Sequence, residues 1–137
     1  MTQIVLDCSI AVSWLFEDEA SESTDQIMIT VKDKGAYVPN LWHLEVVNVL
    51  IQASKQNRLD YTSIPARLDI LSRLPIKTDL ETHTRAFSDT LYLAEERRLT
   101  SYDAAYLELA FRRKLILATK DKALKKAAEH LEIPLLF

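Results

Sequence analysis

The sequence predicts an α/β protein: a single-domain three-layer α/β/α sandwich with a mainly parallel sheet. Short apolar runs typical of buried strands alternate with stretches of helical periodicity along the chain. Such alternation favours right-handed βαβ units, whose helices cover both faces of a parallel sheet. The length of 137 residues fits one domain, and a single glycine argues against a turn-rich all-β fold. We therefore expect residues 1–137 to form one domain.

The N-terminal part of the chain contains a strand and two predicted helices. The apolar run Ile4–Leu6 is typical of a buried strand, and Ser9 is placed to cap the short helix that follows it. The next helix has the spacing of a capping box at Ser23 and Gln26. Gly35 is placed to end this helix.

The middle of the chain is predicted to be mostly helical. After a minimal strand at Tyr37–Val38, residues 41–55 form an expected helix that is apolar on most of its circumference and therefore largely buried. Its one polar stripe has i, i+3, i+7 spacing and consists of Glu45, Asn48 and Gln52. A second helix from about Ser63 makes a helical hairpin with the first and ends before Pro75. Ile76–Thr78 is a further short strand.

The C-terminal half continues the alternation of helices and strands. A helical stripe over 82–97 is followed by a helix that carries Asp103 in its first turn. Leu115–Ala118 is the second clear buried strand, and another helix begins after Asp121. The chain ends in a short strand at 133–137, which we place at a sheet edge because its proline cannot donate a ladder hydrogen bond.

Four acidic side chains occupy related places in this pattern. Two follow the clearest strands, one starts a helix, and one begins the polar stripe of an otherwise apolar helix. Ligands of open α/β sheets bind at the carboxyl ends of the strands, so we expect these acids to converge. Clustered carboxylates raise one another's pKa unless a cation neutralises them, and oxygen ligands without His or Cys favour Mg²⁺ or Mn²⁺. The candidate catalytic and metal-binding residues are Asp7, Glu45, Asp103 and Asp121.

Each of these acids also has a purely structural interpretation. Asp103 and Asp121 could be acids at helix starts, where the helix macrodipole stabilises them by about 0.3 to 1 kcal/mol. Glu45 could lie on a solvent-exposed face. Asp7 is the hardest to explain in this way, because a carboxylate at the end of a buried strand loses hydration and needs a partner.

Polar and basic residues near the acids are candidates for supporting roles. Ser9 and Thr119 each lie two residues from a strand-end acid and could orient a carboxylate or a water, or could cap a helix. Asn48, one helical turn beyond Glu45, could do the same or merely continue the polar face. The candidate substrate-binding residues, which could contact phosphates, are Lys120, Lys122 and Arg113. A charge run is more often a solvated face.

Composition narrows the possible classes of function. The sole cysteine, Cys8, excludes an internal disulfide and suits a reducing cytoplasm. The early apolar run is interrupted by an acid, so we expect neither a signal peptide nor a membrane span and predict a cytoplasmic protein. A formal charge of −3 gives no bulk attraction to nucleic acid, so binding would need local basic patches. No Gly-rich phosphate loop is present, which excludes P-loop and Rossmann nucleotide sites.

Four motifs in this order resemble the PIN domain family, most closely the VapC-type toxins of bacterial and archaeal toxin–antitoxin pairs. They are Asp7-Cys8-Ser9 after the first strand, EVVNVL at 45–50, SYDAAYLELA at 101–110 and LATKDKAL at 117–124. The resemblance covers essentially the whole chain. Cys8 stands where alanine is frequent and Arg113-Lys114 replace a glycine-containing turn, but neither departure removes a candidate ligand.

The resemblance implies a Mg²⁺- or Mn²⁺-dependent endoribonuclease that uses one or two ions. The family's acidic quartet matches the four acids above, and its supporting polar positions match Ser9, Asn48 and Thr119. The reaction would be hydrolysis of an RNA phosphodiester by a metal-activated water, leaving 5′-phosphate and 3′-hydroxyl ends. The resemblance also implies a homodimer and a small antitoxin protein that blocks the site.

Two other classes of protein are consistent with parts of this pattern. A phospho-acceptor signalling domain also gathers acids and Mg²⁺ at strand ends, but its acceptor Asp should follow a central strand, and Val38 is followed by Pro39-Asn40. A catalytically inactive PIN-like module that only binds proteins would have the same fold. The presence of all four acids disfavours this second alternative.

Overall fold

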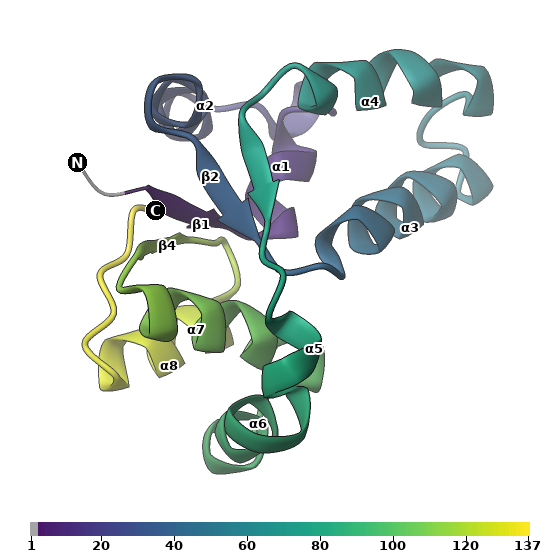
Figure 1. Ribbon diagram of the computed structural model, residues 1–137. Helices are drawn as coiled ribbons and strands as arrows, with labels where there is room; N and C mark the ends of the chain where they lie inside the picture. Colours follow the sequence, from purple (N-terminus) through teal and green to yellow (C-terminus); the bar gives the residue numbers. More distant parts are fainter. Residues whose placement is uncertain (1–2) are drawn as a thin grey trace.

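A computed structural model describes residues 3–137 and contains one four-stranded sheet in which every pairing is parallel (Figure 1). The strands are β1 (Ile4–Leu6), β2 (Ala36–Val38), β3 (Ile76–Thr78) and β4 (Ile116–Ala118). Their order is β3-β2-β1-β4, and Ile4 pairs with Ala36 on one side and with Ile116 on the other. The predicted α/β class with a mainly parallel sheet is therefore confirmed, with β1 in the interior of the sheet.

Helices cover both faces of the sheet, and α1 and α2 lie across it from α7 and α8 (Figure 1). Their bounds are α1 (Cys8–Ser13), α2 (Glu22–Lys34), α3 (Trp42–Lys55), α4 (Ile64–Ser72), α5 (Thr82–Arg85), α6 (Leu91–Arg97), α7 (Ser101–Arg113) and α8 (Lys122–His130). Short 3₁₀ turns lie at Glu17–Glu19 and Tyr61–Ser63. Within residues 3–137, none of the helices is long and apolar enough to cross a membrane.

Helix α7 lies at the centre of the core. Every residue from Ala104 to Ala110 is buried, and the helix packs against both β1 and β4. Tyr106 is among the largest fully buried side chains, with 0% of its surface exposed. Because side chains on all sides of this helix are packed, its position relative to the sheet is tightly constrained.

Two helix starts differ from the sequence prediction. The capping box of α2 is formed by Ser21 and Thr24, rather than by Ser23 and Gln26, because the Thr24 hydroxyl can accept the Ser21 N–H in place of a Glu or Gln. Ser9 does not cap the first helix. It lies inside α1, and its hydroxyl donates to the side chain of the residue that precedes the helix.

Helix α3 is less buried than its apolar sequence predicts. Trp42, Val46, Leu50 and Ala53 are buried, but the opposite stripe is open, with Leu44 74% exposed. The α3–α4 hairpin projects from the edge of the sheet, so only one stripe of α3 meets the rest of the chain (Figure 1). The expectation of a largely buried helix was therefore wrong for half of its surface.

The last predicted strand and the predicted helix over 82–97 also differ from the sequence prediction. The segment 133–137 contributes only a single parallel bridge, between Leu135 and Leu117, although this bridge does lie at the β4 edge as expected. The helix is interrupted by a π-helical turn at Ala86–Thr90, which joins α5 to α6.

Gly35 allows the chain to pass from α2 into β2. Its φ of +81° and ψ of 173° lie in a region that L-residues rarely adopt, and an added Cβ would stand 3.2 Å from the carbonyl oxygen of Pro75. We predict that Gly35→Ala lowers the free energy of unfolding by about 1–3 kcal/mol, because alanine must be held in this strained conformation.

Urea unfolding monitored by circular dichroism would measure this loss of stability. Lys32→Ala, at an exposed position of the same helix, is the control and should change stability by no more than about 0.5 kcal/mol. An unchanged unfolding midpoint for Gly35→Ala would contradict the argument from backbone strain.

Candidate functional site

Asp7 directly follows β1 at the carboxyl edge of the sheet. Its side chain is 6% exposed, and its Oδ2 accepts hydrogen bonds from Ser9 Oγ and Thr119 Oγ1, each at 2.6 Å. Ser9 belongs to α1 and Thr119 follows β4, so the carboxylate joins two segments that are far apart in sequence. The buried charge is thus held by two hydroxyl groups.

The same two hydroxyls fix the loop that follows β4. The N–H of Lys120 donates to Ser9 Oγ at 2.9 Å, and the N–H of Asp121 donates to Thr119 Oγ1 at 3.0 Å. Asp121 is also the N-cap of α8, where its Oδ1 accepts the N–H of Leu124 at 2.8 Å. The capping interpretation of Asp121 is therefore correct, and this contact occupies only one of its two carboxylate oxygens.

Helix α7 brings a third acid to the site and contacts a fourth. Asp103 lies in its first turn, half-buried, and its N–H is capped by the hydroxyl of Thr100. One turn later, the hydroxyl of Tyr106 donates to Oε1 of Glu45 at a distance of 2.5 Å. Glu45 itself lies in the first turn of α3 and is half-buried.

The pKa values of the acids indicate that they share one environment. Burial raises the pKa of Asp7. The hydrogen bonds from Ser9 and Thr119 lower this pKa in part, and the negative charge of Asp121 raises it further. Burial raises the pKa of Glu45 to about 7, with the Tyr106 hydrogen bond lowering it and the charges of Asp7 and Asp103 raising it. Burial, then the charges of Asp121 and Asp7, raise the pKa of Asp103. The pKa values of Asp7, Glu45 and Asp103 are therefore each raised in part by the charge of another acid named in the sequence analysis.

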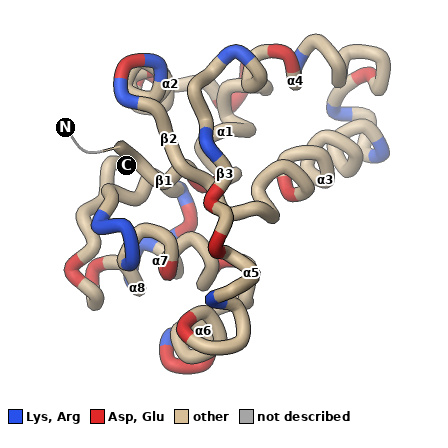
Figure 2. The backbone as a smooth tube through the Cα atoms, viewed as in Figure 1, with Lys and Arg blue, Asp and Glu red and all other residues tan. Residues whose placement is uncertain are grey.

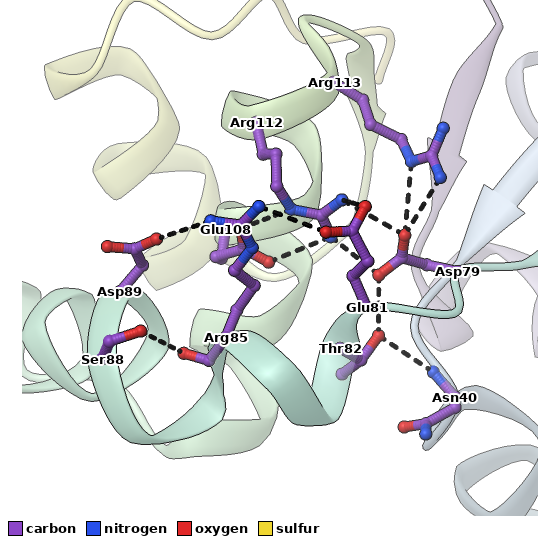
Figure 3. Close-up of polar contacts among 10 residues, drawn as sticks. All are labelled: Asn40, Asp79, Glu81, Thr82, Arg85, Ser88, Asp89, Glu108, Arg112 and Arg113. Carbon is purple, nitrogen blue, oxygen red and sulfur yellow. Dashed lines mark hydrogen bonds and ion pairs between the residues drawn. The ribbon is translucent and has the colours of Figure 1, made fainter.

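Asp79 can be compared with Asp7, because it also directly follows a strand and its side chain is buried, with 1% exposed. Arg112 Nη2 donates to it at 2.7 Å and Arg113 Nη2 at 3.2 Å, and the Thr82 hydroxyl donates at 3.0 Å (Figure 3). Burial alone would raise the pKa of Asp79, but the hydrogen bonds from Arg112 and Thr82 outweigh it, and the pKa is lowered. This carboxylate is therefore neutralised by the protein itself.

Sequence reasoning missed this second cluster. Figure 2 shows acidic residues along the segment from β3 to α5, and these include Asp79 and Glu81, both in contact with Arg112. The available signal was an acid directly after a predicted strand, which is the same signal that identified Asp7. The arginines that pair with it lie more than 30 residues further on.

The other candidates divide between the two clusters. Lys120 is half-buried and Lys122 exposed, and both flank Asp121, while Asn48 is exposed one turn beyond Glu45 on α3. Arg113 differs from the lysines. Its guanidinium pairs with Asp79 and lies 4.3 Å from the centre of the Tyr37 ring. Lys120 and Lys122 therefore stay candidates as sequence neighbours of Asp121, whereas Arg113 belongs to the cluster around Asp79.

The donor set of the site suits a hard divalent cation. Among residues 3–137, no three His, Cys, Asp or Glu side chains are close enough to hold an ion by themselves. Mg²⁺ commonly keeps several waters and is bound through one or two carboxylates together with substrate phosphates, so a closed protein cage is not required. The oxygen-only donors and the raised pKa values of Asp7, Glu45 and Asp103 fit such an ion. The residues that could hold it are Asp7, Glu45, Asp103 and Asp121.

Open α/β sheets bind their ligands at the carboxyl ends of the strands, and carboxylates at this edge are of the type that holds Mg²⁺ together with substrate phosphates. The family model of the PIN domain matches residues 4–130, and the chain belongs to this family. PIN domains are generally nucleases of a metal-dependent superfamily that use ions such as Mg²⁺ or Mn²⁺.

A solved structure shares this fold. The chain is similar to the crystal structure of PAE2754 from Pyrobaculum aerophilum, with a TM-score of 0.69 and 23% sequence identity over 92% of this chain and 86% of that chain. At this level of identity the likeness concerns the fold. A search of curated proteins found no match.

The raised pKa of Glu45 predicts a stability gain on neutralising this side chain. An acid whose folded-state pKa is raised from 4.5 to about 7 binds more protons in the folded protein, so it removes stability as pH rises through this range. Glu45→Gln should therefore stabilise the metal-free protein at pH 8, by about 1 kcal/mol after allowance for its partial exposure, and leave stability at pH 4 nearly unchanged.

Urea unfolding in EDTA at the two pH values would test this. Glu95→Gln, at an exposed position of α6, is the matched control and should show no such difference. If Glu45→Gln were equally or less stable than the wild type at pH 8, the proposed burial of charge would be wrong.

Proposed function

We propose that this chain is a Mg²⁺- or Mn²⁺-dependent endoribonuclease that hydrolyses RNA phosphodiester bonds in the cytoplasm. The observation that carries the proposal is the difference between two buried strand-end acids. Asp79 is paired with two arginines, whereas Asp7 is held only by hydroxyl and backbone groups and shares its environment with further acids. Such an arrangement is costly unless a cation from outside the chain neutralises it.

The residues of the site support in-line hydrolysis. A bound divalent ion would polarise the scissile phosphate and activate water for attack. Ser9 and Thr119 hold the carboxylate of Asp7 in place. Lys120 and Lys122, which flank Asp121 in the sequence, would contact phosphate oxygens. The water oxygen forms a bond to phosphorus while the P–O3′ bond breaks. The attacking water gives up one proton, the 3′ oxygen takes up one as it leaves as a hydroxyl, and the other product carries a 5′-phosphate.

We further propose that the ribonuclease is the toxin of a toxin–antitoxin pair. The motifs of the sequence are most similar to VapC-type toxins, and a small antitoxin needs a surface on which to bind. An apolar groove between α3 and α4 supports this role, because it is lined by Trp42, Val46, Leu68 and Leu71. The indole N–H of Trp42 is buried and finds no acceptor among the described residues. A partner backbone could supply that acceptor.

A homodimer is the second partner that we propose. Several large apolar side chains are exposed, above all Phe87, with 94% of its surface accessible, and Leu80, with 80%. Clusters of exposed apolar groups commonly mark protein interfaces. Phe87 lies in the π-helical turn, and Leu80 lies two residues before α5.

The alternative function is that of an inactive PIN domain that only binds proteins. The observation in its favour is that no three potential metal ligands within residues 3–137 enclose a site. Both functions use the same fold, so activity has to decide between them.

RNA cleavage is the direct test of the proposed activity. Purified protein incubated with total RNA and Mg²⁺ or Mn²⁺ should produce fragments with 5′-phosphate ends, and EDTA should abolish them. Asp7→Asn and Asp103→Asn should each lower the rate by at least about 100-fold, because each removes a charged group from the site.

Asp69→Asn, an exposed acid on α4 that pairs with Arg73, is the control and should retain full activity. Cleavage that survives in EDTA or in both site variants would refute the nuclease proposal. If neither cleavage nor metal binding occurs, the protein-binding alternative takes its place.

Thermal unfolding provides a test that does not depend on the RNA substrate. Mg²⁺ should raise the melting temperature, since a ligand present at 100 times its dissociation constant adds about 2.7 kcal/mol of stability. The gain should be larger at pH 8 than at pH 6, because at pH 6 protons compete for Glu45, whose pKa is about 7.

Differential scanning calorimetry at both pH values would measure this gain. Asp7→Asn should lose most of the Mg²⁺ effect, and Asp69→Asn should keep it. A Mg²⁺ effect that grows as pH falls would contradict binding by these carboxylates.

A further inference from the structure

The contact between Tyr106 and Glu45 suggests a role that goes beyond packing. The two residues are 61 positions apart in sequence, and the Tyr106 hydroxyl reaches out of the core to the Glu45 carboxylate. A buried tyrosine hydroxyl needs a hydrogen-bond partner, but a backbone carbonyl would satisfy it equally well. That the partner is an acid of the proposed metal centre therefore calls for a functional explanation.

The orientation of the Glu45 carboxylate would otherwise be poorly determined. The terminal torsion of a glutamate side chain has a broad distribution, so an exposed carboxylate rotates readily. Glu45 is only half-buried, in the first turn of a helix whose outer face is open. The hydrogen bond from Tyr106 restricts this rotation by fixing Oε1.

Tyr106 can act as a fixed reference point because α7 is held at two places. Asp103 and Tyr106 have i, i+3 spacing and so lie on one face of the helix, toward the acids. At its C-terminal end, Arg112 ties the helix to the buried carboxylate of Asp79 at 2.7 Å, and Glu108 of the same helix orients the guanidinium, also at 2.7 Å (Figure 3). The helix that supplies one proposed ligand thus also orients another.

We propose that Tyr106 is a positioning residue that fixes the Glu45 carboxylate and thereby makes the site prefer Mg²⁺ and Mn²⁺ over Ca²⁺. This inference rests on the proposed metal centre. Mg²⁺ demands near-ideal octahedral geometry, whereas Ca²⁺ accepts six to eight oxygens in flexible arrangements, including carboxylates that bind through both oxygens. A carboxylate of fixed orientation therefore suits Mg²⁺, and a freely rotating carboxylate suits Ca²⁺.

The test compares metal affinities of the full-length chain. Tyr106→Phe removes only the hydroxyl, and Tyr37→Phe is the matched control, because Tyr37 packs beneath Arg113 outside the acidic site. Dissociation constants for Mn²⁺ are measured by electron paramagnetic resonance, and those for Ca²⁺ by competition. We expect Tyr106→Phe to weaken Mn²⁺ binding by about 10-fold or more, as for other residues that orient metal ligands, and Ca²⁺ binding much less.

A double-mutant cycle distinguishes positioning from a general structural effect. If Tyr106 acts through Glu45, then Tyr106→Phe should have no further effect on Mn²⁺ affinity in a Glu45→Gln background. Should Tyr106→Phe fail to fold, Glu45→Asp withdraws the carboxylate from the hydroxyl without altering the core. It should likewise lower the ratio of Mn²⁺ to Ca²⁺ affinity.

The possible results separate this inference from the proposed function. If the wild type binds Mn²⁺ and Asp7→Asn does not, but Tyr106→Phe retains the wild-type affinities, the metal centre stands and the role of Tyr106 is refuted. Equal weakening of Mn²⁺ and Ca²⁺ would also refute it. If the wild type binds no metal at all, the metal centre and this inference fail together.

Discussion

The structure is arranged around a carboxylate that is buried without a cationic side chain to neutralise it. Asp7 follows an interior strand of the sheet, where every neighbouring element is already packed, and only hydroxyl and backbone groups reach it. Hydrogen bonds of this kind offset part of the loss of hydration, but they do not supply a countercharge. The hydroxyls come from α1 and from the end of β4, so the same interactions that hold the charge also join the first and last parts of the sheet.

The cluster around Asp79 shows that this chain can neutralise a buried strand-end acid. There, two arginines from one helix complete the charge balance, and the carboxylate becomes part of the scaffold. The acids around Asp7 are left with a net negative charge that opposes folding in the absence of metal. Sites that bind ligands commonly carry such a local loss of stability, and the packed core has to compensate for it. Asp7 and Asp79 both directly follow a strand, but they differ in role. Helix α7 supplies two arginines to Asp79, whereas only hydroxyl and backbone groups reach Asp7.

Much of the fold and the four acids could be predicted from sequence, because both depend on local patterns. Apolar runs at β1 and β4 and the acids beside them are visible without knowing the packing. The contacts that give the site its shape are not local: Thr119 reaches Asp7 across 112 positions, and Tyr106 reaches Glu45 across 61. The exposure of Leu44 was missed for a related reason, since periodicity identifies an apolar stripe but not whether another element covers it. Ser9 was expected to cap a helix because serine is common at helix starts. That preference does not reveal that the Ser9 hydroxyl instead donates to the buried carboxylate of Asp7.

Helix α7 explains how a site built from separate loops can have a defined geometry. A helix buried on all sides normally has to be apolar, yet α7 carries Asp103, Tyr106, Glu108 and Arg112. Two of these side chains pair with other segments of the chain, Tyr106 with Glu45 of α3 and Arg112 with Asp79 after β3, and their directions around the helix differ. Pairs that point in different directions resist both rotation and sliding of the helix. The separation between Asp103 and Glu45 is therefore determined by a rigid core element, which is the condition under which flexible acidic side chains can present a reproducible set of oxygens to an ion.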